Sequence, residues 1–306
     1  MPFDPDHEIR RTAVLTARKL AQDYGDIVPL TVLRNGFLHQ GQRYSFGSFQ
    51  NGIYRPAAFQ GSAALSLLTA APKPGKPRPY EDSYDPDTKL FTYHYRSGSP
   101  DQADNRALRA ACRERVPIIY FEGIAPGQYM PMAPMNVTHD DPAARTVLIT
   151  AALPSADTGP EGITSAPDLR AYALTEVKRR LHQQKFRVAV LQAYRQRCTV
   201  CALKQAELVQ AAHIVEDPDP EGVAAVVNGL ALCAIHHLAY DRNLMGIDPN
   251  GEVHIASKLL DQVDGPMLRE GLQGFHGRSI EQPRRNLDKP DRKRLEVRYE
   301  RFKAAA

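Results

Sequence analysis

Two short segments with the same spacing bring together residue types that bind metal ions. Cys198 and Cys201 form one C-x-x-C pair, and Cys233 and His236 repeat that spacing further along the chain. Each such turn presents two ligands, so two turns supply the four that tetrahedral zinc needs. The spacing therefore predicts a structural zinc site. Three reduced thiols that hold no metal remain the alternative.

Four more polar residues lie between these ligands or just after them. They are His213, Asn228, His237 and Asp241. His237 and Asp241 are four residues apart, so on a helix their side chains share one face and can share one ion. The segments around these residues are, in chain order, AAHI, NGLALC and HHLAYD. They resemble the HNH endonuclease family, and the resemblance covers about residues 187–256. That family has a ββα-metal fold, a two-stranded ribbon followed by a helix.

The resemblance implies a role for each of these side chains. His213 would be the general base that activates water, since an imidazole has a pKa close to the working pH. Asn228 would hold that histidine, and His237 would bind a catalytic divalent cation, magnesium or manganese, together with Asp241. The chain departs from many family members at Ala212, where they carry a metal-binding Asp or His. A hard cation such as magnesium can replace missing protein ligands with water.

The N-terminal part of the chain carries a second resemblance. The segments RPYEDSYDPDTKLFTYHYR and DQADNRALRAACRERVPIIYFEG are similar to the SRA (SET and RING associated) domain, and the similarity covers about residues 28–150. SRA domains are curved β-sheets that flip a modified cytosine out of DNA. An extruded base stacks between aromatic side chains, and hydrogen bonds read its edge. The resemblance implies a modified-base pocket formed by Tyr80, Asp82, Ser83, Asp85 and Tyr93.

Within that pocket, the resemblance assigns different roles to the aromatic and the acidic residues. Tyr80 and Tyr93 match the two stacking tyrosines of the family. Ser83 stands where family members usually carry a second acidic residue that reads the cytosine amino group. Asp82 or Asp85 would then take that role. The alternative is that the tyrosines are ordinary half-buried strand residues.

The elements that must position these residues follow from hydrophobic spacing and helix-breaking residues. A helix capped by Asp4 is predicted at the N-terminus and ends at a glycine. Short apolar runs over residues 28–153 predict a mostly antiparallel β-domain, interrupted by a helix at about residues 104–114. Residues 153–168 are rich in Pro, Gly, Ser and Thr, which is typical of a linker. A long basic helix follows and runs into Cys198.

Together these patterns predict an α+β protein with two domains. The first is an SRA/PUA-like curved β-sheet domain over residues 1–155, followed by a linker over residues 156–168. The second, over residues 169–306, is a ββα-metal (HNH) nuclease domain that includes the basic connecting helix and a C-terminal tail. A length of 306 residues with 42% hydrophobic residues agrees with two folded domains and excludes wholesale disorder.

Positive charge is unevenly distributed along the chain. Residues 168–197 contain eight Lys or Arg against two acidic residues, and residues 276–303 contain ten against five, although the net charge of the chain is only +4. Clustered cations favour phosphate backbones, because binding releases condensed counterions. Arg187 and Arg195 are therefore expected to contact the DNA backbone. Two solvated helix faces are the alternative.

The functional hypothesis joins the two resemblances. The chain is predicted to be a modification-dependent endonuclease that flips 5-methylcytosine or 5-hydroxymethylcytosine in double-stranded DNA and hydrolyses phosphodiester bonds nearby. Cutting both strands requires two nuclease modules, so a homodimer is expected. One alternative is a non-catalytic, zinc-containing reader of modified DNA. The other is an HNH nuclease directed to another base or backbone modification.

Cysteine content and hydropathy give an expected location. Four cysteines are too few for a disulfide scaffold, and the first thirty residues contain no apolar run of signal-peptide length. Nowhere do 18 consecutive apolar residues occur. The sequence therefore predicts a cytoplasmic protein that has no membrane partner.

Overall fold

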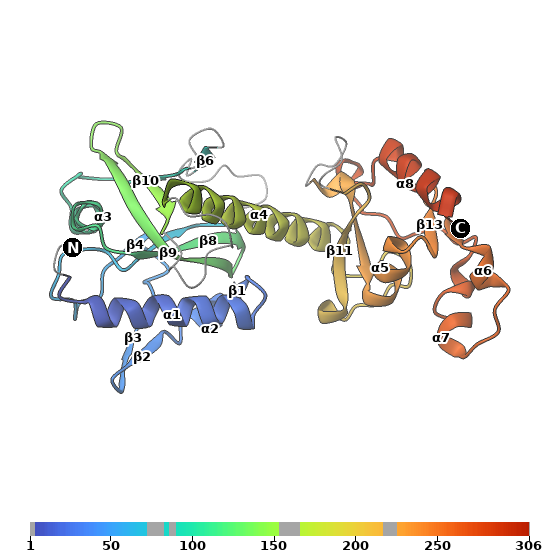
Figure 1. Cartoon of the computed structure of the whole chain (residues 1–306), viewed down its shortest axis with the longest axis horizontal. Helices are drawn as coiled ribbons and strands as arrows, with labels where there is room; N and C mark the ends of the chain where they lie inside the picture. The colour runs from blue at the N-terminus through green and yellow to red at the C-terminus, as the bar shows by residue number, and fades with distance from the viewer. Residues whose placement is uncertain (1–3, 72–82, 86–89, 153–165, 217–224, 306) are drawn as a thin grey trace. The chain divides into compact units, whose positions relative to one another are not determined.

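The computed structural model divides into two compact units, Met1–Leu181 and His182–Ala306 (Figure 1). Each unit contains a cluster of buried hydrophobic side chains. The residues that the structure describes are 4–71, 83–85, 90–152, 166–216 and 225–305. Most of the predicted linker over residues 156–168 lies outside them, and the predicted domain boundaries stay a prediction.

The first unit contains most of the strands of the chain. Its elements, in chain order, are α1 (His7–Asp23), β1 (Val28–Pro29), α2 (Leu30–Leu33), β2 (Phe37–His39), β3 (Gln42–Tyr44), β4 (Ile53–Tyr54), β5 (Ser66–Thr69), β6 (Ser83–Asp85), β7 (Leu90–His94), α3 (Ala103–Glu114), β8 (Ile118–Ala125), β9 (Gln128–Asp141), β10 (Thr146–Ala151) and the first part of α4 (Ala166–Ala193). The helix predicted at residues 104–114 is confirmed as α3.

A mainly antiparallel sheet organises this unit. Its strands follow the order β4, β5, β8, β9, β10, β7, β6, and β1 pairs with β9. The strands β5 and β8 run parallel, and the other strand pairs that the structure describes in this sheet are antiparallel, which confirms the predicted β-domain. Ala13 and Ala17 of α1 share a buried cluster with Ile119 and Phe121 of β8, so α1 covers one face of the sheet (Figure 1). Small residues on α1 permit this close approach.

The start of α1 agrees with the predicted cap at Asp4. The regular helix begins at His7, after a turn in which Oδ1 of Asp4 accepts a hydrogen bond from the backbone N–H of Asp6 at 3.0 Å. The carboxylate of Asp6 accepts hydrogen bonds from the backbone N–H groups of Gln60 and Gly61, at 2.9 and 2.8 Å. Residues more than fifty positions away thus engage this side chain, which local capping rules cannot anticipate.

A buried arginine joins α1 to two other parts of the first unit. Arg10 is 1% exposed, and its guanidinium donates to Asp4 at 3.1 Å, to the carbonyl of Ala64 at 2.7 Å and to that of Pro117 at 3.2 Å. Burial lowers the pKa of Arg10, and the nearby carboxylate of Asp4 opposes that effect. The Arg10 guanidinium is therefore a charged group whose hydrogen bonds connect α1 to the segments at Ala64 and Pro117.

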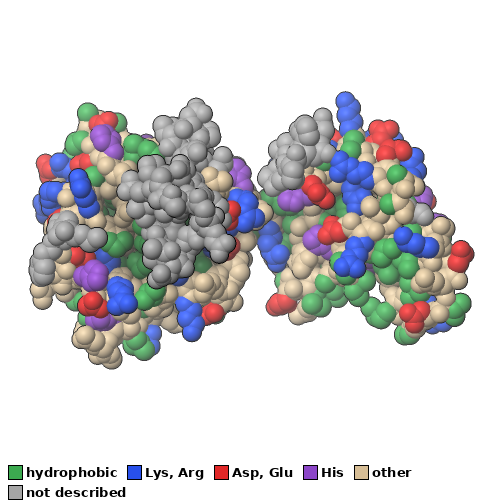
Figure 2. Space-filling view, in the orientation of Figure 1, with side chains coloured by type: hydrophobic (Ala, Val, Ile, Leu, Met, Phe, Trp, Pro, Cys, Tyr) green, Lys and Arg blue, Asp and Glu red, His purple; other side chains and the backbone are tan. Residues whose placement is uncertain are grey.

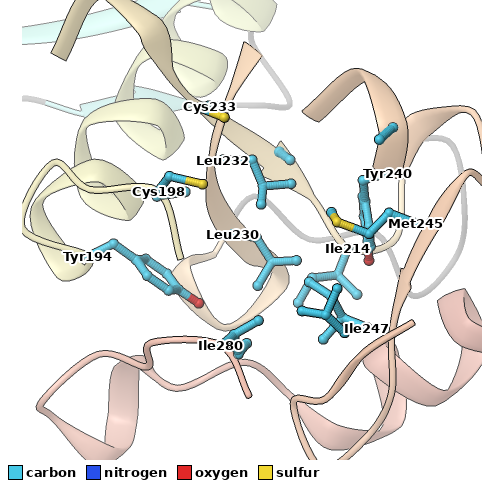
Figure 3. Packing of buried hydrophobic residues seen from close by; sticks show 14 of the residues in the cluster. Tyr194, Cys198, Ile214, Leu230, Leu232, Cys233, Tyr240, Met245, Ile247 and Ile280 are labelled. Atoms are coloured by element: carbon cyan, nitrogen blue, oxygen red, sulfur yellow. The ribbon is translucent and has the colours of Figure 1, made fainter. Parts of the chain in front are cut away.

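The second unit surrounds a short ribbon with small helices. Its elements after α4 are η1 (Ala206–Leu208), β11 (Val209–His213), η2 (Val226–Asn228), β12 (Gly229–Cys233), α5 (Ala234–Asp241), β13 (Met245–Ile247), β14 (Val253–Ile255), α6 (Ser257–Leu260), α7 (Pro266–Arg269), η3 (Gln273–Phe275), η4 (Asn286–Asp288) and α8 (Arg292–Ala305). Figure 3 shows the hydrophobic cluster in which Leu230 and Leu232 of β12 pack near Tyr240, Met245 and Ile247.

The long basic helix ends earlier than the sequence predicts. It stops at Ala193 instead of running into Cys198. Arg195 and Gln196 have φ angles of 56° and 55°, in the left-handed region that a right-handed helix cannot contain. The chain turns there and delivers Cys198 to the end of the ribbon. No helix in the described part of the chain is both long enough and apolar enough to cross a membrane.

Replacing Arg10 by alanine should destabilise the first unit by about 3–5 kcal/mol, because it leaves Asp4 and two buried carbonyl groups without their donor. Urea unfolding of the full chain, followed by far-UV circular dichroism, measures the change. Arg11→Ala is the control, since Arg11 lies on the same helix with a side chain that is 65% exposed. Equal unfolding midpoints for the two variants would show that the Arg10 network does not stabilise the unit.

Candidate metal centre and nuclease site

The four predicted zinc ligands form one cluster in the second unit. Their ligand atoms, from Cys198, Cys201, Cys233 and His236, all lie within 4.8 Å of one another. The first two cysteines come from the turn after α4, Cys233 ends β12, and His236 lies in the first turn of α5. In Figure 3 the sulfur atoms of Cys198 and Cys233 border the hydrophobic cluster near Leu232. The cluster therefore ties three segments together.

Two of the three distances described within this cluster are close to those around a tetrahedral zinc ion, and the third is shorter. With metal–sulfur bonds of zinc length, neighbouring sulfurs should be about 3.8 Å apart and a sulfur and an imidazole nitrogen about 3.6 Å. The Sγ atoms of Cys201 and Cys233 are 3.9 Å apart. The Nδ1 atom of His236 is 3.5 Å from Sγ of Cys198 and 3.1 Å from Sγ of Cys233. Soft sulfur donors with one imidazole are a set that zinc prefers.

Electrostatic coupling inside the cluster favours deprotonation of one thiol. Hydrogen bonds from the thiols of Cys198 and Cys201 lower the pKa of Cys233. Burial opposes a charge on His236, but hydrogen bonds to the sulfurs of Cys198 and Cys233 raise its pKa to about 9. A thiolate is the form of cysteine that binds metal, so Cys233 already has the charge state of a ligand. Hydrogen bonds with Cys198 and Cys233 raise the pKa of Cys201, so a bound metal would displace protons from Cys201 and His236.

The strands β11 and β12 form the predicted ribbon, and α5 follows them directly. The pairing is antiparallel and sets His213 opposite Gly229. The ring of His213 stacks on Phe186 of α4, with centroids 3.9 Å apart and planes 8° apart. A Cβ atom on Gly229 would lie 2.3 Å from Val190, so only glycine allows α4 to pack this closely on the ribbon. Aromatic packing thereby fixes the plane of the His213 ring.

Asn228 is fully buried and connects the two ends of the ribbon loop. Its Oδ1 accepts a hydrogen bond from the N–H of Val215 at 3.0 Å, and its Nδ2 donates to the carbonyl of Val215 at 2.9 Å. Its backbone carbonyl accepts from the N–H of Ile214 at 2.9 Å. These bonds hold the backbone immediately after His213.

His237 has two different neighbours, one for each ring nitrogen. Nδ1 is 2.7 Å from Oε1 of Gln210, and Nε2 is 3.4 Å from Oδ2 of Asp241. One imidazole nitrogen and one carboxylate oxygen at this separation fit a hard cation that keeps several waters. In the described part of the chain, only the cysteine cluster brings three or more ligand atoms of His, Cys, Asp or Glu this close together. The cation site would thus rely on few protein ligands.

Sequence reasoning missed Gln210 and Phe186. Side chains of a strand alternate between its two faces, so Gln210 shares the face of Ala212, and His213 lies on the opposite face. The alternation is readable in the sequence, but the partners that the helices bring to each face are not. Ala212 itself is 1% exposed within the hydrophobic cluster.

The residues predicted for the modified-base pocket are described only in part. Tyr80 and Asp82 lie outside the described residues, and for Ser83 and Asp85 the structure gives only the backbone of β6. Tyr93 on β7 is 4% exposed. Its hydroxyl donates to the carbonyl of Leu68 at 3.2 Å, and its ring lies edge-on to Tyr120.

The two predicted backbone-binding arginines lie on α4 and directly after it. Arg187 is partly buried, and Arg195 is exposed and lies 3.5 Å from Glu281. A cavity of about 440 Å³ is lined by Arg195, Arg284 and Arg285, together with Asp288 and residues of α4. Three guanidinium groups around one hollow are suited to an anion.

Replacing Cys233 by serine should remove the metal, because a serine hydroxyl is a poor ligand and three donors leave a tetrahedral site incomplete. We expect about one zinc per chain in the wild type, measured by inductively coupled plasma mass spectrometry. The Cys233→Ser variant should hold almost none and unfold at a lower temperature. Cys112→Ser, which alters a free cysteine of the first unit, should keep the metal. Full zinc content in Cys233→Ser would contradict the site.

Comparison with known proteins found a family that matches part of the second unit. Residues 198–248 match the HNH endonuclease family. No curated protein matches the chain. Among solved structures, a modification-dependent restriction endonuclease, TagI, is similar at 15% identity over 81% of this chain and 84% of that chain, with a TM-score of 0.28. The matched residues run from the first cysteine of the cluster through the ribbon and α5 to β13. The second unit therefore contains an HNH endonuclease domain.

Proposed function

We propose that this chain is a modification-dependent DNA endonuclease. In this proposal an HNH module over residues 169–306 hydrolyses phosphodiester bonds near a modified cytosine, which a reader domain over residues 1–155 recognises. Residues 156–168 link the two. The observation that carries the proposal is the ribbon and helix that hold His213, Asn228 and His237 within the stretch that matches HNH endonucleases.

His213 is the proposed general base. Its ring plane is held by Phe186, and Asn228 anchors the backbone that follows it. The base takes a proton from a water molecule that attacks the phosphorus atom; the bond to the leaving oxygen then breaks, and that oxygen takes up a proton. A divalent cation, magnesium or manganese, would be held by His237 and Asp241 and would neutralise charge that develops on the phosphate.

A structural zinc is proposed at Cys198, Cys201, Cys233 and His236. The ligand distances and the mixed sulfur and imidazole donors support this choice. The two metal sites differ in chemistry, since soft thiolates select zinc and a carboxylate with an imidazole suits a harder cation. His236 serves the first and its neighbour His237 serves the second.

The first unit is proposed as an SRA-like reader of 5-methylcytosine or 5-hydroxymethylcytosine. The support is the sequence resemblance together with a mainly antiparallel sheet. The strands β6 and β7, which carry Ser83, Asp85 and Tyr93, pair directly with each other. Residues of the proposed pocket thus come from adjacent strands.

Contacts to the DNA backbone are proposed for arginines of the second unit. Arg187 and Arg195 come from α4 and the turn after it, and Arg284 and Arg285 line the same cavity as Arg195. Figure 2 shows Lys and Arg side chains at several places on the visible face of this unit. Such contacts give salt-dependent affinity without reading sequence. A homodimer is proposed, because cutting both strands takes two modules.

Replacing His213 by alanine should slow cleavage by about 10²–10⁴-fold, which is the usual contribution of a general base. The assay is nicking of methylated plasmid DNA with magnesium or manganese, accompanied by a gel-shift measurement of binding that should change little. His254→Ala is the control, since His254 lies in the same unit on β14. A wild-type protein that binds this DNA but never cuts it would favour a non-catalytic reader.

Cytosine-marked DNA should be cut about 10-fold faster or more than unmodified DNA, since one lost base contact typically costs 1–3 kcal/mol. The test compares four versions of one duplex under one ionic condition: unmodified, with 5-methylcytosine, with 5-hydroxymethylcytosine and with N6-methyladenine. Equal rates on all four would refute the cytosine reader. A preference for the adenine mark would redirect the proposal to another base.

A further inference from the structure

The neighbours of His237 place two electron-rich atoms close together, an arrangement that suits a bound cation. Oε1 of Gln210, 2.7 Å from Nδ1, is an acceptor, so the ring proton lies on Nδ1. In a neutral ring Nε2 then carries a lone pair, and it lies 3.4 Å from a carboxylate oxygen of Asp241. A lone pair and a carboxylate repel each other unless a cation or a proton lies between them. The arrangement therefore suits a cation held jointly by Nε2 and Asp241.

The position of Gln210 explains how the ribbon contributes to that site. Gln210 and Ala212 lie on the same face of β11, and the methyl group of Ala212 is no ligand. Gln210 instead reaches His237 on α5 through a direct hydrogen bond. The ribbon thus acts on the cation site through a side chain that orients a ligand.

We propose that Gln210 is a positioning residue for the catalytic cation, which fixes the ring of His237 as the Nδ1–H tautomer and directs Nε2 to the ion. The proposal rests on the proposed function, because it assumes a divalent cation at His237 and Asp241. A histidine ligand commonly donates its other N–H to an acceptor that sets ring orientation and tautomer. Here a neutral amide takes that role, so it adds no charge to the site.

Manganese binding provides a test that does not depend on cleavage. Zinc-loaded full-length protein is titrated with Mn²⁺, and free ion is followed by electron paramagnetic resonance. Loss of such an orienting partner typically weakens metal affinity about 10–100-fold, which we expect for Gln210→Ala. Gln210→Glu keeps an acceptor at the same reach and should bind Mn²⁺ at least as well as the wild type. Gln205→Ala is the matched control, since Gln205 is exposed and bonds to Glu207.

Nitrogen-15 NMR of the histidine rings, recorded with saturating Mg²⁺, gives a second readout. At the Mg²⁺ concentration that just saturates the wild type, the wild type should show His237 protonated on Nδ1 alone, and Gln210→Ala, whose weaker site is then partly empty, should show both tautomers. A His237 ring protonated on both nitrogens in the presence of Mg²⁺ would overturn the proposal. Circular dichroism and zinc content establish that each variant is folded.

The variants also separate this inference from the proposed function. If His237→Ala binds Mn²⁺ as the wild type does, the cation site of the proposed function fails. If His237→Ala loses affinity but Gln210→Ala does not, the cation site stands and the role of Gln210 is refuted. If His237→Ala and Gln210→Ala both lose affinity for Mn²⁺ and Gln210→Glu keeps it, both proposals are supported.

Discussion

With zinc bound as proposed, the cluster of three cysteines and His236 is the constraint on which the second unit depends. It joins the turn after α4, the end of β12 and the first turn of α5. Two strands of five residues form only a marginal ribbon by themselves, and the proposed zinc would add a strong junction at their end to the hydrophobic packing around them. His236 and His237 are consecutive on a helix, where successive side chains point about 100° apart. Closing the cluster through His236 therefore sets the direction of His237.

Helices cover both faces of the ribbon. Because side chains alternate along each strand, the residues of the proposed site are divided between the two faces. On one face, His213 and Gly229 meet Phe186 and Val190 of α4. On the other, Gln210 meets His237 of α5. The helix α4 thus holds the proposed base, and α5 holds the proposed cation ligands. Asn228 anchors the loop between the strands, so each functional side chain is oriented by a contact that substrate binding does not have to create.

Sequence reasoning succeeded where local geometry determines the outcome. The spacing of Cys198, Cys201, Cys233 and His236 predicted the cluster, because a turn is encoded over a few residues, and the resemblance to the HNH family predicted the ribbon and helix. It also predicted the cap at Asp4, whose carboxylate accepts from the N–H of Asp6, but not the distant loop that bonds to the carboxylate of Asp6. It also missed Phe186 and Gln210, whose partners lie 27 positions away in each case. Which tyrosine or carboxylate contacts a base depends equally on long-range packing, so the resemblance alone assigns those roles.

The central claim is that this unit holds two different ions, zinc at the cysteine cluster and a divalent cation at His237 and Asp241. Anomalous X-ray diffraction from crystals grown with zinc and soaked in Mn²⁺, recorded at the absorption edges of both metals, tests it directly. The account predicts a zinc peak among the three sulfurs and a manganese peak between the His237 ring and the Asp241 carboxylate. Manganese found only at the cysteines, or bound away from His237, would contradict it.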